Sequence, residues 1–196
     1  SKQEINQLLK KVYAAFEVIE NPEITLEANP DDLTIKKLNE LAQTKINRLS
    51  IGVQSFFEED LRFMNRAHSS IEAITSIKNS QAVGFKNISV DLIFGSQTTT
   101  DVMWQNNLDT FFSLNIPHLS AYSLTVEEKT ALANQIEKKK VAPVDEEKNY
   151  KQYLMLQTAM KKHGFEQYEL SNYSANKNYS KHNTAYWFGI TYLGLG

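Results

Sequence analysis

Hydrophobic and polar positions along the chain fall into segments that alternate between helix-like and strand-like patterns. Residues 2–19 carry apolar side chains at helical spacing between lysine, glutamine and glutamate residues, which predicts a helix with one buried face. Residues 24–28 form a short segment with two β-branched residues, which predicts a strand. Asp31 and Asp32 follow, and acidic residues favour a helix N-terminus. The start of the chain therefore predicts a helix, a strand and a second helix.

The strand-then-helix unit then recurs along the chain. The expected strands span 48–54, 87–94 and 118–124, and the expected helices begin at Glu58 and span 101–114. Strands separated by helix-length segments predict a parallel sheet made of right-handed βα units. The strands at 87–94 and 118–124 are largely apolar, so we expect both of their faces to be buried.

The pattern changes after the fourth strand. A charged connection leads to an amphipathic helix over 145–163, and Gly164 follows where a C-cap glycine belongs. Residues 165–173 alternate aromatic and polar side chains, which predicts a half-buried strand. Residues 192–196 have the pattern of a strand that enters a glycine loop, and Ser1 opens directly into a helical pattern. We therefore expect the chain to be a fragment at both ends.

Composition narrows the class of protein. The chain has 196 residues, 41% of them hydrophobic and 22% charged, which is typical of one globular domain. The formal net charge is -2 and no long basic run is present, so nucleic acid is not an expected partner. No stretch is apolar enough to span a bilayer and the N-terminus lacks the apolar core of a secretory signal, so we expect a cytoplasmic protein. Cysteine is absent, which excludes disulfides, thiolate nucleophiles and sulfur-ligated metal sites within these residues.

Three acceptor-bearing side chains lie in or just after otherwise apolar strands. They are Glu27, Gln54 and Asp91. In parallel sheets, ligands bind beyond the carboxyl ends of the strands. An unpaired buried polar group costs about 1–3 kcal/mol, so three of them on successive strands favour a shared polar ligand. The alternative is that a backbone amide or a lysine satisfies each one locally.

The order and spacing of several sequence strings resemble a known family. The strings are EITLEANP (23–30), RLSIGVQSF (48–56), NRAH (65–68), NISVDLIFG (87–95), HLSAYSLTVEE (118–128), QYELSNY (167–173) and KHNTAYW (181–187). Together they are similar to oxygen-independent coproporphyrinogen III oxidase-like radical S-adenosylmethionine (SAM) proteins. The match is nearer to the heme chaperone, HemW-type, branch than to the true oxidase. It covers nearly the whole chain, from about Glu23 to Gly196.

The resemblance implies a fold and a set of cofactors. The fold would be α/β, a partial (β/α)6 TIM-like barrel of the radical SAM type that lacks its first strands here, with a C-terminal α+β extension. Residues 1–143 would form the partial barrel, and residues 144–196 would begin the family-specific C-terminal region. The full-length protein would bind SAM and a [4Fe-4S] cluster. Because the cluster cysteines of the CxxxCxxC motif are expected before Ser1, these residues alone should not cleave SAM.

The resemblance also implies roles for five residues in SAM binding. Glu27 would accept hydrogen bonds from the SAM amino group, and Arg66 would pair with the SAM carboxylate, for which a planar guanidinium is well suited. Gln54 and Asp91 would hold the ribose hydroxyls, and Ile93 would lie against the adenine. The alternatives are a solvated helix arginine for Arg66 and an ordinary core isoleucine for Ile93.

The KHNTAYW segment most favours the chaperone branch. A neutral imidazole is a good axial ligand of heme iron, so His182 is the candidate heme ligand, and Tyr186 and Trp187 could pack against the macrocycle. The alternative is a structural histidine beside core aromatic residues. The loop at 95–101 reads GSQTTTD where relatives commonly carry a Gly-Pro-Gly-Gln-Thr-like sequence, so the resemblance does not extend to that loop.

Three functions follow from these observations. The leading hypothesis is a radical SAM protein that binds heme or a porphyrin and delivers it to recipient hemoproteins. The second is an anaerobic coproporphyrinogen III dehydrogenase, which removes hydrogen from propionate side chains before their decarboxylation. The third is a plain barrel hydrolase or aldolase without a cluster, although the sequence offers no lysine at a strand end and no serine–histidine pair for it.

Overall fold

The computed structural model describes residues 1–194. The elements, in chain order, are α1 (Lys2–Ala15), β1 (Thr25–Ala28), the 3-10 turn η1 (Pro30–Asp32), α2 (Ile35–Leu41), β2 (Arg48–Gln54), α3 (Glu58–Phe63), α4 (Ser70–Val83), β3 (Asn87–Phe94), α5 (Asp101–Ser113), β4 (His118–Ser123), α6 (Ala131–Glu137), α7 (Glu146–Lys162), β5 (Glu166–Gln167), β6 (Asn172–Ser174) and α8 (Lys181–Trp187).

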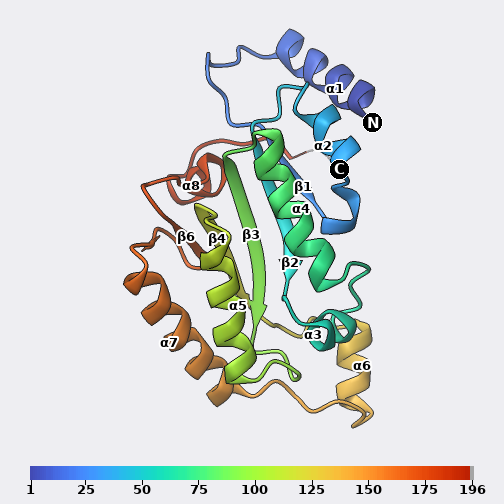
Figure 1. Ribbon diagram of the computed structural model, residues 1–196, viewed down its shortest axis with the longest axis vertical. Coiled ribbons are helices and arrows are strands. Elements are labelled where there is room, and N and C mark those ends of the chain that lie inside the picture. Colours follow the sequence, from blue (N-terminus) through green and yellow to red (C-terminus); the bar gives the residue numbers. More distant parts are fainter. Residues whose placement is uncertain (195–196) are drawn as a thin grey trace.

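The strands form one sheet in the order β1-β2-β3-β4-β6-β5 (Figure 1). Strands β1 to β4 pair in parallel, which confirms the predicted parallel sheet of βα units. Strands β6 and β5 extend the sheet in antiparallel pairings beside β4. The result is a mixed α/β fold with an open, partial barrel, as the sequence predicted.

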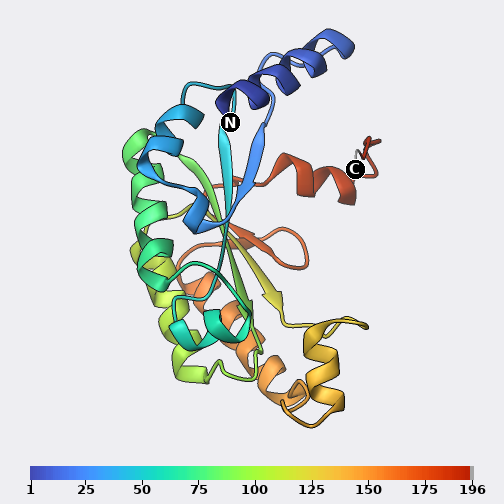
Figure 2. The same ribbon diagram turned by 90° about the vertical axis from the view of Figure 1, so that its right-hand side faces the viewer.

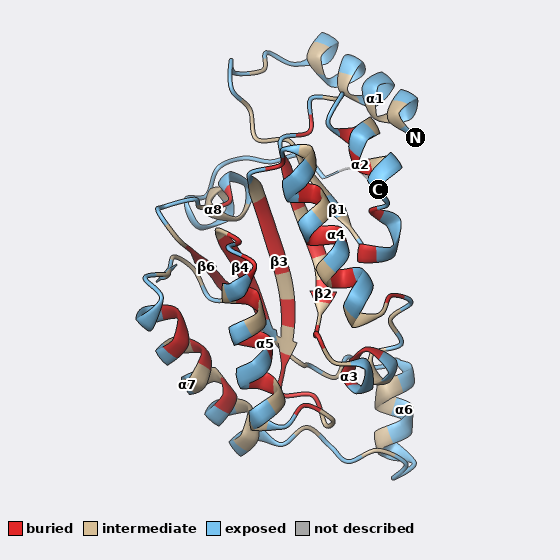
Figure 3. Ribbon diagram, viewed as in Figure 1, coloured by how far each residue is buried: buried red, intermediate tan, exposed pale blue. Residues whose placement is uncertain are grey.

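The two faces of the sheet differ in chemistry. Helices α2, α4, α5 and α7 cover one face, and Figure 2 shows this helical layer on a single side of the sheet. Buried side chains of alternate strand positions, such as Ile88, Val90 and Leu92 on β3, pack with those helices into one core (Figure 3). The opposite face carries Ser89, Asp91 and other polar residues. The prediction that both faces of β3 and β4 are buried holds at Ser89, His118 and Ser120 on the inner face. It fails towards the carboxyl ends, where Asp91, Ile93 and Tyr122 are partly exposed.

The N-terminal helix is shorter and more exposed than predicted. It ends at Ala15 instead of reaching residue 19, and none of its residues is buried among those described. Ser1 caps it in a capping box with Glu4. Its apolar stripe includes Leu8, 61% exposed, and the stripe continues past the helix end to Phe16, 57% exposed, because α1 lies beyond the end of the sheet (Figure 1). The helix expected from Asp31 begins only after η1.

The C-terminal part follows the predictions in its long helix and departs from them afterwards. Helix α7 is capped by Asp145, and Gly164 adopts a left-handed φ of 74° just past its end, as expected. The single strand expected over 165–173 is instead two short strands, because the Glu169 carboxylate accepts from the Ser171 amide and turns the chain between them. His182 lies in α8, residues 192–194 form no strand, and the rest of the expected glycine loop lies outside the described residues.

No helix within residues 1–194 combines the length and the hydropathy that crossing a membrane would need. Whether the chain divides at residue 143 stays a prediction, although α7 packs on the same core as the first 143 residues and β6 pairs with β4.

Candidate functional site

The inner face of the sheet carries its polar side chains in successive layers. The strand register places Thr25 level with Arg48 and Asn87; Glu27 with Ser50, Ser89 and His118; Gly52 with Asp91 and Ser120; and Ile93 with Tyr122. The layers climb from the amino ends of the strands to their carboxyl ends. The core helices lie on the other face, and α8 reaches over the amino half of this one, so a ligand between α8 and the sheet can meet polar groups from β1 to β4.

A hollow of about 720 Å³ lies at the carboxyl ends of the strands, and we call it the carboxyl-end hollow. Three of the predicted SAM-binding residues line it: Gln54, Arg66 and Ile93. Gln54 ends β2 in a left-handed conformation with φ of 67°, beside an irregularity in the β2–β3 register at Gly52 and Gln54. Positive φ is uncommon for a residue with a side chain and tends to occur at functional sites. The structure thus brings these three predicted residues together.

Gly52 is the point around which the polar groups of this hollow gather. A Cβ placed on Gly52 would lie 3.0 Å from the Gln54 Nε2, 3.4 Å from the Arg66 Nη2 and 3.7 Å from the Asn29 Oδ1. Asp91 is the register partner of Gly52 on the adjacent strand. Two side-chain amides and a guanidinium therefore gather at a position with no side chain of its own, one strand away from Asp91.

The Arg66 guanidinium is held in place but not saturated. Its Nη2 donates to the Asn29 side chain and, over 3.2 Å, to the Gly52 carbonyl oxygen. Its Nε is buried without a hydrogen-bond partner among the described residues. His68, on the same loop, is held by a hydrogen bond between its Nε2 and the Val53 carbonyl oxygen at 3.0 Å. A fixed guanidinium with an unused donor is suited to binding a carboxylate.

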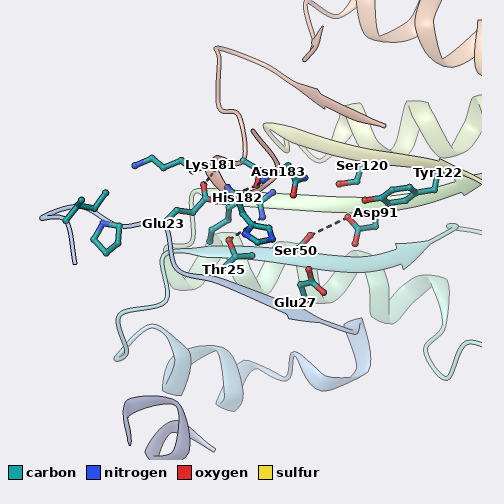
Figure 4. A pocket seen from close by; sticks show the side chains of 14 residues that line it. Glu23, Thr25, Glu27, Ser50, Asp91, Ser120, Tyr122, Lys181, His182 and Asn183 are labelled. Atoms are coloured by element: carbon teal, nitrogen blue, oxygen red, sulfur yellow. Dashed lines mark hydrogen bonds between the residues drawn. The ribbon is translucent and has the colours of Figure 1, made fainter. Parts of the chain in front are cut away.

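A second hollow of about 720 Å³ lies over the amino half of the sheet (Figure 4), and we call it the lumen hollow. The predicted residues Glu27, Asp91 and His182 line it, together with Arg48. The five predicted SAM-binding residues are therefore divided between two hollows on one sheet face. Gly52, next to Asp91 in the register, lies where the two groups of residues meet.

Asp91 is the most perturbed acid of the lumen hollow. Burial raises the pKa of its carboxyl group from 3.8 to about 6, and the charge of Glu27 acts in the same direction. Hydrogen bonds from Ser120 and Ser50 act against that rise, the latter over 3.4 Å. A carboxylate with few protein partners retains the capacity to accept hydrogen bonds from a ligand.

Helix α8 reaches the lumen hollow because Glu23 holds its first turn. The Glu23 carboxylate accepts from the backbone amides of Lys181, at 3.1 Å, and His182, at 3.3 Å, and Figure 4 shows these contacts. The Ser180 side chain caps the same turn through the Asn183 amide. The His182 ring packs edge-on against Tyr186 with 5.0 Å between ring centroids. His182 is exposed among the described residues.

His118 forms a buried network beneath the lumen hollow. Its Nδ1 lies 2.7 Å from the Ser89 Oγ, and its Nε2 lies 2.7 Å from the Tyr168 hydroxyl. Tyr168 in turn accepts from the Ser180 amide at 3.2 Å. Burial and the nearby charge of Arg48 lower the pKa of His118 to about 3, so the ring is neutral at physiological pH. This network joins the sheet to the N-terminus of α8.

Sequence reasoning missed four residues that shape the two hollows: Glu23, Asn29, Arg48 and Gly52. One signal was available. In both strand strings, every second residue is polar or glycine: Arg48, Ser50, Gly52 and Gln54 in RLSIGVQ, and Asn87, Ser89 and Asp91 in NISVDLIF. This period of two predicts that each strand has one polar face. The role of Glu23 had no such signal, because it depends on a contact with residues about 160 positions later in the chain.

The residues present fit SAM but do not supply the ligands of a cluster. An unsaturated guanidinium and the Gln54 amide beside Gly52, with the Glu27 and Asp91 carboxylates in the adjoining hollow, match the groups of a ligand that has an amino acid group and a ribose diol. The 196 residues contain no cysteine, so they provide no thiolate to a [4Fe-4S] cluster. Within the described part of the chain, no three histidine or acidic residues are grouped to hold a metal ion.

Comparison with known proteins places the chain in a family. Residues 2–111 match the Radical SAM superfamily. The heme chaperone HemW of Bacillus subtilis is 38% identical over 174 residues, covering 89% of this chain and 46% of that protein. HemW of Escherichia coli is 34% identical over 191 residues, covering 96% and 49%. The mitochondrial radical S-adenosyl methionine domain-containing protein 1 of Danio rerio is 33% identical over 174 residues, covering 89% and 39%.

A solved structure supports the fold. The coproporphyrinogen III oxidase HemN of Escherichia coli, a radical SAM enzyme, aligns with a TM-score of 0.78 and 21% identity, covering 97% of this chain and 43% of that one. At that identity the likeness shows the fold alone. The chain spans about half the length of the HemW proteins it matches. Because the superfamily match extends over more than half of the 196 residues, the chain belongs to the radical SAM superfamily.

Proposed function

We propose that this chain is the SAM-binding part of a radical SAM protein that binds heme and delivers it to recipient hemoproteins. The observation that carries the proposal is the pair of hollows on one sheet face, one around the unsaturated Arg66 guanidinium and the other beneath the exposed His182. The named function of the HemW relatives supports the heme part of the proposal. We also propose that the protein works in the cytoplasm.

In the proposed SAM site, each residue type suits one group of the ligand. Arg66 binds the carboxylate and Glu27 accepts from the amino group. Gln54 and Asp91 accept from the ribose hydroxyls, and Ile93 lies against the adenine. Glu27 stands one layer below Asp91 in the register, so the ligand passes beside Gly52, next to the ends of the Gln54 and Arg66 side chains. Next to a [4Fe-4S] cluster reduced by one electron, SAM would supply a 5′-deoxyadenosyl radical with release of methionine, and we propose that the cluster thiolates belong to protein outside these 196 residues.

In the proposed heme site, His182 is an axial ligand of the iron. Heme is the cargo here, and the hollow of about 720 Å³ beneath His182 receives it. The contact of Tyr186 with the imidazole ring fixes the ring orientation. Glu23 fixes the helix that carries both residues.

The two alternative functions have weaker support. The likeness to HemN shows a shared fold and therefore does not favour dehydrogenase activity over heme delivery. Membership of the radical SAM superfamily removes the reason for a plain barrel hydrolase or aldolase.

A heme titration of the full-length, cluster-loaded protein tests the proposal. We expect the heme absorption band to shift on binding in the wild type, and His182→Ala to lose that shift and at least about tenfold in affinity, since an iron–imidazole bond is removed. His163→Ala is the matched control, because His163 is an exposed histidine at the end of α7. Equal heme binding by all three proteins would refute the assignment, and conversion of coproporphyrinogen III by the wild type under anaerobic conditions would refute the chaperone function.

A further inference from the structure

The lumen hollow contains a buried cation without an ionic partner. Arg48 is 4% exposed, and no carboxylate lies within 4 Å of its guanidinium among the described residues. Its Nη1 makes one long contact, 3.5 Å, with the Thr25 Oγ1, and its Nε has no hydrogen-bond partner in residues 1–194. A buried charge with unused donors is costly unless an anion or water satisfies it.

The acids of the hollow do not fill this need. Glu23 is bound to the α8 amides, and Glu27 and Asp91 lie in register layers above Arg48. The charge of Arg48 acts on Asp91, but neither acid forms an ion pair with Arg48 within the described residues. Arg48 lies in the lowest layer of the hollow, level with Thr25, whereas Lys181 and His182 line the same hollow from α8. A ligand held by His182 therefore has a buried guanidinium within the same enclosure.

We propose that Arg48 binds a propionate carboxylate of the heme that His182 ligates. This inference rests on the proposed heme function and names the group that fixes the orientation of the cargo. Heme carries two propionates on one edge, and a guanidinium binds a carboxylate through two parallel hydrogen bonds. With one edge anchored at Arg48 and the iron at His182, the macrocycle enters the lumen hollow with its propionate edge toward the amino ends of the strands.

Comparing the affinities for heme and for heme dimethyl ester distinguishes the Arg48–propionate contact from ligation of the iron. Both compounds offer the same iron and the same ring, but the ester has no carboxylate charge. We expect wild-type, full-length protein to bind heme about 10- to 100-fold more tightly than the dimethyl ester, because a charge-assisted hydrogen-bonded pair contributes on the order of that ratio. In Arg48→Met the ratio should fall to nearly one. His182→Ala should weaken both compounds and leave their ratio unchanged.

Lys78→Met is the matched control, since Lys78 is an exposed cation on α4, in the helical layer, and lines neither hollow. It should keep the wild-type ratio. Equal affinity of the wild type for heme and ester overturns the inference without using any variant, and so does a ratio that survives in Arg48→Met. If the wild type binds neither compound, the proposed heme function fails and the inference fails with it. If the wild type binds both compounds with equal affinity, the Arg48 contact is refuted but the proposed heme function is not.

Discussion

At the scale of single residues, Asp91 shows how the candidate site affects stability. Its pKa is about 6 in the folded chain and 3.8 as an ordinary aspartate, with burial as the main cause. Below pH 3.8 the group is protonated in both states and has no effect. Between pH 3.8 and 6 the folded state holds the proton more tightly, so stability falls as the pH rises, and the full cost persists above pH 6.

Asp91→Asn should therefore stabilise the fold above pH 6 and have little effect near pH 4. The pKa difference corresponds to about 2–3 kcal/mol, an order-of-magnitude figure. Urea unfolding at pH 4 and pH 7.5 measures it. The same variant should bind SAM less tightly, because an ionised carboxylate accepts from the ribose hydroxyls through two charged oxygens, whereas an amide has one neutral acceptor oxygen. A variant no more stable than the wild type at pH 7.5 would show that Asp91 is not destabilised by burial.

Gly52→Ala tests the gathering of polar groups around the open position. The new Cβ would lie 3.0 Å from the Gln54 Nε2, the end of a flexible side chain, so the fold should tolerate it. The Gln54 amide must move, and the methyl group occupies the path that the ligand needs. We expect SAM affinity to fall about tenfold or more with a thermal midpoint within a few degrees of wild type. Unchanged SAM affinity would place the ligand elsewhere.

Some site residues could be predicted from the sequence and others could not. Glu27, Gln54 and Asp91 were found because acceptors in apolar strands are unusual, and Arg66 was found through the family resemblance. Arg48 was predicted only as part of the strand 48–54, and its burial in a hollow shared with the start of α8 joins residues about 130 positions apart. Such a contact has no local sequence pattern.

At the scale of elements, α8 depends on a distant acid for its position. Glu23→Ala should remove the carboxylate that accepts from the Lys181 and His182 amides in the first turn of α8. We expect this loss to destabilise the N-terminus of α8 by about 1 kcal/mol. We expect faster amide hydrogen exchange over residues 181–187 and weaker heme binding. Glu20→Ala, at a nearby exposed acid, is the control and should change neither quantity. Exchange over α8 that is the same in both variants would contradict the anchoring role of Glu23.

The sequence predicted the parallel strands and α7 well because their hydrophobic periods are strong. It was less successful where local turns compete with a strand pattern. Residues 165–173 alternate as a strand should, yet Glu169 bonds to the Ser171 amide and the chain reverses there. The apolar stripe of α1 predicted burial, but the helix lies past the sheet and no layer of the described residues covers it.

At the scale of the whole molecule, one sheet separates two environments. The helical layer on one face supplies the hydrophobic core, and the polar inner face holds both hollows at different heights along the same strands. This division allows the fold to tolerate unpaired cations such as Arg48 and Arg66, because the core on the other face supplies the stability. Glu27 and Asp91 line the hollow proposed for heme although they are assigned to SAM, so the two sites adjoin. Arg66 and His182 lie in different hollows, and we expect their loss to affect SAM binding and heme binding separately.

The most direct test of that division is the SAM affinity of full-length, cluster-loaded protein, measured by calorimetry for the wild type, Arg66→Ala and His182→Ala. Loss of a buried, charge-assisted contact should weaken SAM binding by about 10- to 100-fold in Arg66→Ala. His182→Ala should bind SAM as the wild type does. If Arg66→Ala keeps wild-type affinity, or if His182→Ala loses as much affinity as Arg66→Ala, the carboxyl-end hollow is not a separate SAM site.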